Sequence, residues 1–272
     1  MASRTVLTTG ANSGIGLATV LELARRGYRS VGSVRSEAKA EEVRRAAAEA
    51  GVAVETVRMD VTDADACAEA VDRLAPWALV NNAGYSVTGA IEDVDDAEAR
   101  LALETMVVAP ARLARLALPH MRAQGGGRII NVSSIMGLTT TPLTGWYQAC
   151  KHALEGLSDA LRMEVAKDGV RVSLIEPGGF KTGIWEEAER EVARRAGSRY
   201  ESAYRRSMDG ARLVQVVMGD PAQVAKVITR ALGSRAPRAR YLVGYDAQGI
   251  ALAQRFTPTV VKDAVTRLVL GL

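Results

Sequence analysis

Tyr147 and Lys151 lie four positions apart in the stretch GWYQACKHALEG, residues 145–156, which has Ala and Leu at helical spacing. Residues i and i+4 share one face of a helix, so the ammonium group of Lys151 is expected about one turn from the phenol of Tyr147. A free tyrosine has a pKa of about 10, and a nearby positive charge lowers it. The pair could therefore donate a proton. An isolated Tyr-x-x-x-Lys pair is more often a surface cation beside an aromatic ring, so the rest of the chain must decide.

A glycine-rich loop joins the first strand-like run to a helix-like run. The run RTVLTT, residues 4–9, leads into TGANSGIG with Gly10, Gly14 and Gly16. Glycines at such a junction allow a tight turn and let the backbone approach a pyrophosphate at a helix N-terminus, where free N–H groups and the helix dipole favour an anion. Similar loops also occur for steric reasons alone, but the position after the first strand of a βαβ unit predicts a dinucleotide site.

Arg35 bears on the choice of nucleotide. An acidic side chain about 20 residues after a dinucleotide loop would bind the ribose 2′-hydroxyl of NAD. Here the second strand-like run ends in GSVRS, with Val34 and Arg35 and no carboxylate. A guanidinium can pair with a 2′-phosphate. The sequence therefore favours NADP (NADPH) over NAD, although Arg35 could also be an ordinary solvated loop arginine.

Strands and helices that alternate along the chain must position these residues. Short β-like runs between Ala-rich helical segments predict βαβ units and a parallel sheet. No linker or fixed-period repeat divides the chain, so 1–272 is predicted to be a single doubly wound α/β domain with a central parallel sheet flanked by helices. We expect strands at 4–9, 29–34, 52–59, 77–82, 127–134, 170–177 and 240–245, and helices at 14–27, 37–51, 63–74, about 95–123 and about 145–167.

Residues 182–218 interrupt this alternation. They look like two irregular helices rich in Arg and Glu, inserted before the final strand. Ligands of open α/β sheets bind outside the carboxyl ends of the strands, so an insertion at this point can cover the site. We interpret 182–218 as a substrate lid; a helical hairpin without function is the alternative.

Composition argues against several other classes of protein. The net charge of +4 is spread over mixed-sign stretches and does not form a stripe for nucleic acid. Cys67, Cys150, His120 and His152 are too few for a disulfide framework or a metal cluster, so we expect no metal and a reducing cytoplasm. The longest uncharged stretch, 129–150, contains Asn, Ser, Thr, Pro and Gly and predicts no membrane span. We also expect no signal peptide at the start of the chain.

The C-terminal stretch VVKDAVTRLVLGL, residues 260–272, is amphipathic. Such a segment could touch a membrane surface. We prefer the interpretation that it packs on the domain or on a neighbouring subunit.

Together the motifs resemble the classical short-chain dehydrogenases/reductases, which have a Rossmann-type fold, and the resemblance covers nearly the whole chain. The motifs, in order, are TGANSGIG, DVTD, NNAG, INVSSIMG, the Tyr-x-x-x-Lys pair and PGGFKT. The ending RARYLVGYDAQ is similar to the branch of ketone reductases that includes 17β-hydroxysteroid and retinol dehydrogenases. The resemblance implies that the cofactor is bound by Gly10, Asn12, Ser13, Gly14, Ile15, Gly16, Arg35, Asp60, Val61, Asn82, Ala83, Gly84, Tyr147, Lys151, Pro177, Gly178 and Thr182.

The resemblance also implies a catalytic role for three residues. Ser134, 13 residues before Tyr147, would hydrogen-bond the substrate carbonyl oxygen. Tyr147 would donate a proton to that oxygen, or remove it in reverse, while hydride passes to or from nicotinamide C4. Lys151 would lower the pKa of Tyr147 and hold the nicotinamide ribose hydroxyls. Ser133 is expected to be structural, because adjacent residues leaving a strand point in opposite directions.

Met106 departs from the family pattern. Comparable helices commonly read E-T-N-x-x-G-P, whereas this chain reads ETMVVAP, so Met106 stands where the family usually has asparagine. That asparagine normally helps to hold a water that relays protons to the active-site lysine. A thioether is only a weak acceptor and cannot position water in the same way. The relay is therefore replaced locally, or turnover is impaired, or the chemistry has changed.

These observations support one leading function and two alternatives. The leading hypothesis is an NADP-dependent oxidoreductase that acts on a ketone or secondary alcohol of an apolar small molecule. A dehydratase, epimerase or isomerase could use the same Tyr147 and Lys151 without net redox, and a cofactor-binding protein with impaired catalysis is suggested only by Met106. Family members usually pair through the long helices before and after strand five, so we expect a homodimer or homotetramer.

Overall fold

The computed structural model describes residues 3–215 and 218–272. Within these residues, seven parallel strands form one sheet in the order β3-β2-β1-β4-β5-β6-β7. The chain runs outward from β1 to β3 and then returns to place β4 beside β1, which is the crossover of a doubly wound fold. The strands are β1 (Thr5–Thr8), β2 (Arg29–Val34), β3 (Glu55–Arg58), β4 (Ala78–Asn81), β5 (Gly127–Val132), β6 (Val170–Pro177) and β7 (Arg240–Val243).

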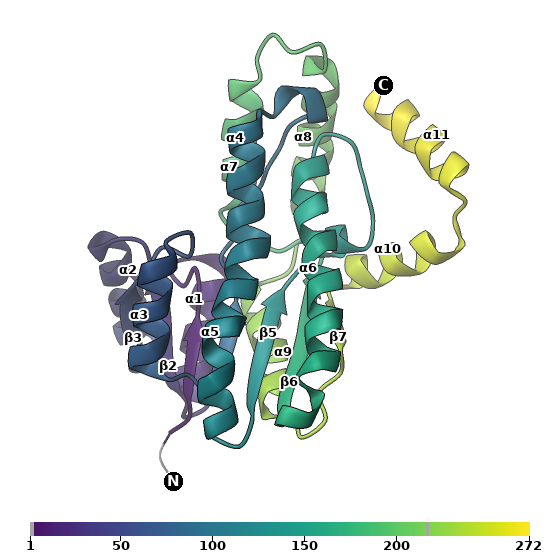
Figure 1. Ribbon diagram of the computed structural model, residues 1–272. Coiled ribbons are helices and arrows are strands. Elements are labelled where there is room, and N and C mark those ends of the chain that lie inside the picture. Colours follow the sequence, from purple (N-terminus) through teal and green to yellow (C-terminus); the bar gives the residue numbers. More distant parts are fainter. Residues whose placement is uncertain (1–2, 216–217) are drawn as a thin grey trace.

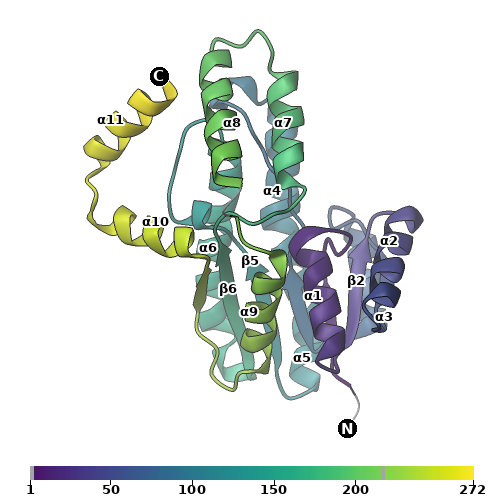
Figure 2. The same cartoon turned by 180° about the vertical axis from the view of Figure 1, so that it is seen from behind.

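Helices cover both faces of the sheet, as the two opposite views show (Figures 1 and 2). Helices α1 (Gly14–Arg25), α2 (Glu37–Glu49) and α9 (Pro221–Gly233) pack on one face, and α3 (Ala64–Leu74), α5 (Ala109–Ala123) and α6 (Gly145–Glu164) on the other. Successive strand residues point to opposite faces, so Val6 faces α9 while Leu7 faces α3 and α5. Because both faces are covered, the central strands β1 and β4 are almost entirely buried and carry no charged residue.

The remaining elements gather beyond the carboxyl ends of the strands (Figure 1). Helices α7 (Ile184–Arg194) and α8 (Glu201–Gln215) form a hairpin there, and α10 (Tyr245–Phe256) and α11 (Thr259–Leu270) make a C-terminal arm. Helix α4 (Asp96–Leu103) continues into α5 through a π-helical segment, η2 (Glu104–Val108), and three short 3-10 turns complete the chain: η1 (Ile91–Asp93), η3 (Ile135–Gly137) and η4 (Ala166–Asp168).

The predicted domain and sheet are confirmed, with corrections in individual elements. The helix expected over about 95–123 is interrupted by the π-helical segment η2, and the strand expected over 52–59 is shortened to β3. Helices α9 and α10 were not predicted from the sequence. Two helices do occupy 182–218, although residues 216–217 of that range lie outside the described residues. In the described part of the chain, no helix has both the length and the apolar character that crossing a membrane requires.

Candidate active site

All the predicted motifs lie at one edge of the sheet, because parallel strands end on the same side. The glycine-rich loop follows β1, Arg35 follows β2, Asp60 follows β3, the NNAG segment ends β4, Ser134 follows β5 and Pro177 ends β6. The fold therefore brings together segments that are more than 160 residues apart in the sequence.

The loop after β1 is shaped for close backbone approach. Gly10 and Gly14 have φ of +65° and +51°, which a side chain would disfavour. A Cβ on Gly16 would overlap the carbonyl oxygen of Gly10 and lie 2.6 Å from Asn82 Nδ2. Ser13 is the N-cap of α1, and its side chain makes no capping hydrogen bond, so it leaves the first N–H groups of the helix available to an anion. Asn12 and Ile15 complete this loop and are partly buried.

The NNAG segment packs directly against this loop. Asn82 Nδ2 donates to the carbonyl oxygens of Thr9 and Gly10 at 3.0 and 3.2 Å, and the Thr9 hydroxyl accepts from the amides of Asn82 and Ala83 at 3.0 and 2.9 Å. Thr9 was not singled out by its sequence, because a threonine ending a strand carries no recognisable signal. These bonds fix the glycine loop and Gly84 relative to each other.

The nucleotide end of the proposed site lies at β2 and β3. The amide of Ala11 donates to the carbonyl oxygen of Ser33 at 3.1 Å, which holds the glycine loop against the end of β2. Arg35 follows at once, is exposed, and makes no ion pair with any residue that the structure describes. Asp60 is partly buried and accepts from the amide and hydroxyl of Thr62 at 2.9 and 2.8 Å, while Val61 is buried. Arg35 is therefore free to bind a phosphate.

Ser134, Tyr147 and Lys151 converge between β5 and α6. Ser134 is buried, and its Oγ accepts from the amide of Met136 at 3.1 Å at the start of η3. Lys151 Nζ lies 5.6 Å from the centroid of the Tyr147 ring. Gln148 holds the segment before α6, because its Nε2 donates to the hydroxyls of Thr141 and Thr144 at 2.9 and 2.7 Å. The helix thus presents phenol and ammonium on one face, as their spacing predicts.

The electrostatics of Tyr147 differ from the expectation. Burial raises the pKa of the phenol, and the hydrogen bond with Ser134 opposes that rise. The spacing of Tyr147 and Lys151 alone predicted a lowered pKa. Desolvation of the phenol is the largest cause, and Cys150 adds to the rise, whereas Lys151 Nζ donates to the carbonyl oxygen of Val132 at 2.9 Å.

Lys151 is itself strongly perturbed. Its side chain is almost completely buried, and this burial lowers its pKa to about 8, against the opposing effects of Cys150 and Glu155. A buried lysine with a pKa close to neutrality can exchange protons readily at physiological pH. Lys151 is therefore suited to returning protons to Tyr147.

Met106 is packed into the core beside Tyr147. It lies in η2, is 1% exposed, and shares an apolar cluster with Val87, Ala102 and Cys150, against which Tyr147 also packs. A Cβ on Gly84 would be 3.4 Å from both Cγ and Sδ of Met106. The methionine thus fills the space beneath the NNAG segment, where its flexible side chain suits an irregular gap.

Thr182 lies against the glycine loop, and Pro177 and Gly178 lie at the end of β6. A Cβ on Gly14 would be 3.1 Å from Thr182 Cγ2, so the first residue of the 182–218 segment touches the start of α1. Pro177 is buried at the end of β6, and the amide of Gly178 donates to the carbonyl oxygen of Val243 at 2.9 Å.

Asp246 is a further residue at this place that sequence reasoning missed. Its carboxylate accepts from the amide of Gly179 at 2.5 Å, and a Cβ on Gly178 would overlap it. Its position at the start of α10 follows from tertiary packing and from no local motif.

The hairpin of α7 and α8 is fixed to the segment after β4. Arg195 donates to the carbonyl oxygens of Thr88 and Asp93 and pairs with Glu98 at 2.6 Å. Tyr204 is buried and donates to Asp93 Oδ2 at 2.7 Å. These contacts place the hairpin over the same edge of the sheet as Tyr147.

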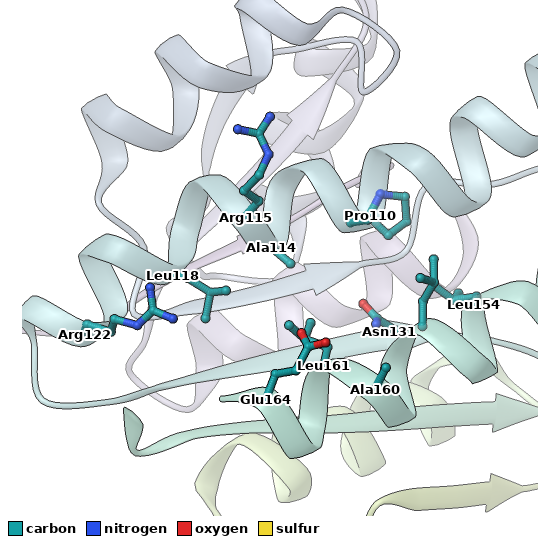
Figure 3. A pocket seen from close by; sticks show the side chains of 12 residues that line it. Pro110, Ala114, Arg115, Leu118, Arg122, Asn131, Leu154, Ala160, Leu161 and Glu164 are labelled. Carbon is teal, nitrogen blue, oxygen red and sulfur yellow. The ribbon is translucent and has the colours of Figure 1, made fainter. Parts of the chain in front are cut away.

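A separate apolar cavity of about 370 Å³ lies between α5 and α6 on the outer surface (Figure 3). Leu118, Leu154 and Leu161 line it together with Arg115 and Glu164. The catalytic candidates do not line it, so it is not the site described above. Among the described residues, no group of three or more His, Cys, Asp or Glu side chains is placed to hold a metal ion.

Comparison with known proteins agrees with this geometry. A family model described as "short chain dehydrogenase" matches residues 4–193, which is more than half of the chain. The chain belongs to the short-chain dehydrogenase family. The predictions of this family, of its fold and of an NAD(P)-dependent oxidoreductase are therefore confirmed.

Two curated relatives show where the chain lies among the short-chain dehydrogenases. It is 36% identical over 265 residues to the uncharacterized oxidoreductase YusZ of Bacillus subtilis, covering 94% of this chain and 93% of the relative. It is 33% identical over 281 residues to retinol dehydrogenase 7 of Rattus norvegicus, covering 96% and 86%. The resemblance to the retinol dehydrogenase branch is thus confirmed as a similarity.

Solved structures of other short-chain dehydrogenases superpose well on this chain. One from Streptomyces avermitilis has a TM-score of 0.80 at 30% identity, covering 98% of this chain and 96% of that one. Actinorhodin polyketide ketoreductase with NADPH has a TM-score of 0.78 at 27% identity, covering 92% and 97%. A short-chain dehydrogenase/reductase from Burkholderia phymatum in complex with NAD has a TM-score of 0.80 at 28% identity, covering 93% and 92%. These similar structures thus hold either nucleotide.

Proposed function

We propose that this short-chain dehydrogenase is an NADP-dependent reductase of a ketone, or in reverse a dehydrogenase of the secondary alcohol, with an apolar small molecule as substrate. The observation that carries the proposal is the convergence of Ser134, Tyr147 and Lys151 beside the glycine loop at the carboxyl edge of the sheet. The NADPH bound to a similar polyketide ketoreductase and the names of the retinol dehydrogenase relatives also support it.

The residues of this edge fit a dinucleotide. A pyrophosphate would be held by the N–H groups at the start of α1, next to Gly14 and Gly16, where side chains would obstruct it. Arg35 would bind the 2′-phosphate, and the absence of a carboxylate at the end of β2 favours NADP. Asp60 and Val61 would lie at the adenine, with Asn82, Ala83, Gly84, Pro177, Gly178 and Thr182 toward the nicotinamide. When bound, the nicotinamide supplies or accepts the hydride.

The protein side chains carry the proton chemistry. Ser134 donates a hydrogen bond to the substrate oxygen and stabilises the negative charge that develops on it. Tyr147 transfers its phenolic proton to the same oxygen during reduction. Lys151 then returns a proton toward the phenolate and binds the ribose hydroxyls. The apolar surroundings of Tyr147, including Val87, favour a substrate with apolar groups beside the carbonyl.

The hairpin of α7 and α8 would cover the substrate as a lid over residues 182–218. Its attachment to Thr88, Asp93 and Glu98 and the contact of Thr182 with Gly14 support this role, because these partners follow β4 and β1 at the carboxyl edge of the sheet.

Oligomer formation would use the apolar cavity between α5 and α6. Leu157, which is 44% exposed, lies at its rim. Burial of this surface between two copies supports a homodimer, or a homotetramer if a second interface forms. Location in the cytoplasm stays a prediction that rests on Cys67 and Cys150, both of which are buried and free.

A panel of ketones and secondary alcohols tests the proposal. We expect stoichiometric NADPH oxidation with at least one apolar ketone, and slower turnover with NADH. Product formation without net cofactor consumption would instead indicate a dehydratase, epimerase or isomerase. Tight NADPH binding without any turnover would indicate a cofactor-binding protein.

A further inference from the structure

A row of four polar side chains lies along one face of α6. It begins in the candidate active site and leads away from it. Tyr147, Lys151, Glu155 and Asp159 follow each other at intervals of four residues, so each lies one turn beyond the last. Lys151 and Glu155 are 5% and 6% exposed, whereas the side chain of Asp159 is 36% exposed. The row therefore leads from the Tyr147 phenol along α6 to the exposed Asp159.

Glu176 from β6 lies against the middle of this row and is 1% exposed. Arg240 from β7 joins the carboxyl groups: its Nε donates to Glu155 Oε2 at 3.0 Å and lies 3.2 Å from Glu176 Oε1, and its Nη2 donates to Asp159 Oδ2 at 2.8 Å. The Nε proton points to Glu155, so both oxygens of Glu176 lack a hydrogen-bond donor among the described residues. One guanidinium thus serves two buried carboxyl groups.

Two buried carboxyl groups beside a single cation are most stable when they hold a proton between them. Burial and the neighbouring Glu155 raise the pKa of Glu176 to about 7, with Arg240 opposing the rise and Asp159 adding to it. The pKa of Lys151, lowered to about 8 by its burial, lies close to this value. Arg162, which pairs with Asp159 at 2.6 Å, is the remaining charged group at this end of the row.

Each turnover in the direction of reduction leaves Tyr147 without its proton, so protons must enter from solvent. The thioether of Met106 cannot position a relay water on the other side of Lys151. Ser133 Oγ and Glu155 Oε1 are buried without hydrogen-bond partners among the described residues. They face the same point above Gly137, where a Cβ would be 2.8 and 3.4 Å from them. Two buried oxygens without partners thus lie near Gly137, and one of them belongs to Glu155, which stands one turn of α6 from Lys151.

We propose that Glu155 and Glu176 form a proton store that recharges Lys151 from solvent through the exposed Asp159 and Arg240 end of the row. The inference rests on the proposed function and deepens it by assigning two positioning residues to proton supply. The carboxyl pair gives one proton to Lys151 after Lys151 has passed one to the Tyr147 phenolate. Solvent then returns one proton to the pair, so each cycle consumes one proton and leaves all four side chains in their starting states.

The test compares NADPH-dependent ketone reduction by the parent protein with that of Glu176→Gln and Glu176→Asp between pH 5.5 and 9. The parent kcat should fall as pH rises past about 7, because the store loses its proton. Glu176→Gln keeps the shape of the side chain but cannot titrate, so kcat at neutral pH should fall about tenfold or more and this pH dependence should disappear. Glu176→Asp should recover most of the loss, and the Kd for NADPH should stay unchanged in both variants.

Glu22→Gln is the matched control. Glu22 is also buried and pairs with an arginine, Arg26, at 2.9 Å, but it lies on α1 away from Lys151. Its replacement should leave kcat and the pH profile as in the parent. A readout independent of turnover is ¹³C NMR of protein labelled at the glutamate carboxyl carbons. One resonance should titrate near neutral pH and be missing from Glu176→Gln.

The possible results separate the proton store from other roles. A Glu176→Gln variant with the kcat and pH profile of the parent would show that protons reach Lys151 by another path. Equal losses of kcat in Glu176→Gln and Glu176→Asp, with a lowered Tm and weak NADPH binding, would show that Glu176 has a purely structural role. The same conclusion would follow if no carboxyl resonance titrated near neutral pH. If the parent protein reduces none of the ketones, the proposed function is contradicted. If the parent is active and Glu176→Gln has the same kcat and pH profile, only the proton store is contradicted.

Discussion

Tyr147 combines a buried phenol with a hydroxyl neighbour and a cation one turn away. Replacing it with phenylalanine removes the proton donor and keeps the ring, so we expect Tyr147→Phe to lower kcat by about 10² or more. Because the ring still packs against the cluster around Met106, the Kd for NADPH and the Tm should change little. Steady-state rates with the best ketone give kcat, and a binding titration gives the Kd for NADPH. Near-parental reduction by this variant would contradict the assigned proton donor.

Met106 offers a second prediction at the same scale. The side chain is 1% exposed among Val87, Ala102 and Cys150, which supports repacking of this position around an apolar group. Asparagine would be left partly unsatisfied there, so Met106→Asn should cost on the order of 1–3 kcal/mol of stability with no increase in kcat. The measurements are the free energy of unfolding from urea denaturation and kcat, and Met106→Leu is the apolar control. A faster variant of undiminished stability would mean that Met106 is a broken proton relay.

Local motifs revealed the residues that we propose for cofactor binding and catalysis but not the residues that support them. Gly14, Ser134, Tyr147 and Lys151 stand in recognisable spacings, so the sequence alone located them. Thr9 and Asp246 act through contacts made only in the folded chain, and no spacing announces them. Glu176 did carry a signal, because a carboxylate directly after the apolar pair Leu174 and Ile175 is unusual for a strand that is buried on both faces.

Among the elements, the π-helical segment η2 explains why the long helix before β5 was predicted as continuous. Its sequence has helical periodicity on both sides, and periodicity does not reveal one widened turn. Pro110 supplies the physical reason: it has no N–H to donate to the carbonyl oxygen of Met106, and its ring would clash there in a regular α-helix. Widening the turn, with the amide of Ala109 donating to Glu104, accommodates the proline without ending the helix.

The end of β2 carries the prediction on nucleotide choice. Arg35 is exposed beside the glycine loop and has no ion-pair partner in the described residues, so it is free to bind the 2′-phosphate that we propose. Arg35→Ala should raise KM for NADPH, by the equivalent of about 1.5–3 kcal/mol, and leave KM for NADH nearly unchanged. Arg58→Ala, at the end of β3, serves as a matched control for loss of one surface charge. Equal effects on both cofactors, or a parent that prefers NADH, would contradict the NADP assignment.

For the whole molecule, the doubly wound fold and its parallel sheet followed from the alternation of strands and helices, whereas the strand order was not predicted. The C-terminal arm did not follow from this alternation, because α10 and α11 are short and exposed and their direction depends on a few contacts such as the bond from Lys262 to Thr140. Hydrophobic periodicity indicates which side chains pack on a core. Few side chains of the C-terminal arm are buried, so periodicity does not predict where the arm lies.

Stability should depend on pH through Glu176. Its pKa is about 7 in the folded protein and about 4.3 in an unfolded chain, so the folded state binds the additional proton between these values. The stabilisation is present below pH 4 and is lost as pH rises through about 7, with a ceiling of about 4 kcal/mol. The free energy of unfolding of the parent should therefore decrease more over this interval than that of Glu176→Gln. Parallel curves for the two proteins would contradict the raised pKa.

Association of two copies should depend on the apolar surface between α5 and α6. Leu157→Arg would place a charge where a partner must pack and should shift the protein from dimer or tetramer to monomer in analytical ultracentrifugation. Leu213→Arg, on the exposed side of α8, introduces the same charge elsewhere and should leave the assembly intact. Unchanged association in the first variant would place the interface on another surface.

The hydrogen bond between Gly179 and Asp246 ties the start of the C-terminal arm to the loop after β6. Any molecule that pulls α10 away must break this bond and release the backbone beside Gly178, so it would alter the affinity of that loop for a dinucleotide. Thermodynamic reciprocity then requires the dinucleotide to alter the affinity of the arm for that molecule by the same factor. The start of α10 and the loop after β6 would then act as one coupled unit, so a displacement of α10 would change the affinity of the protein for its cofactor.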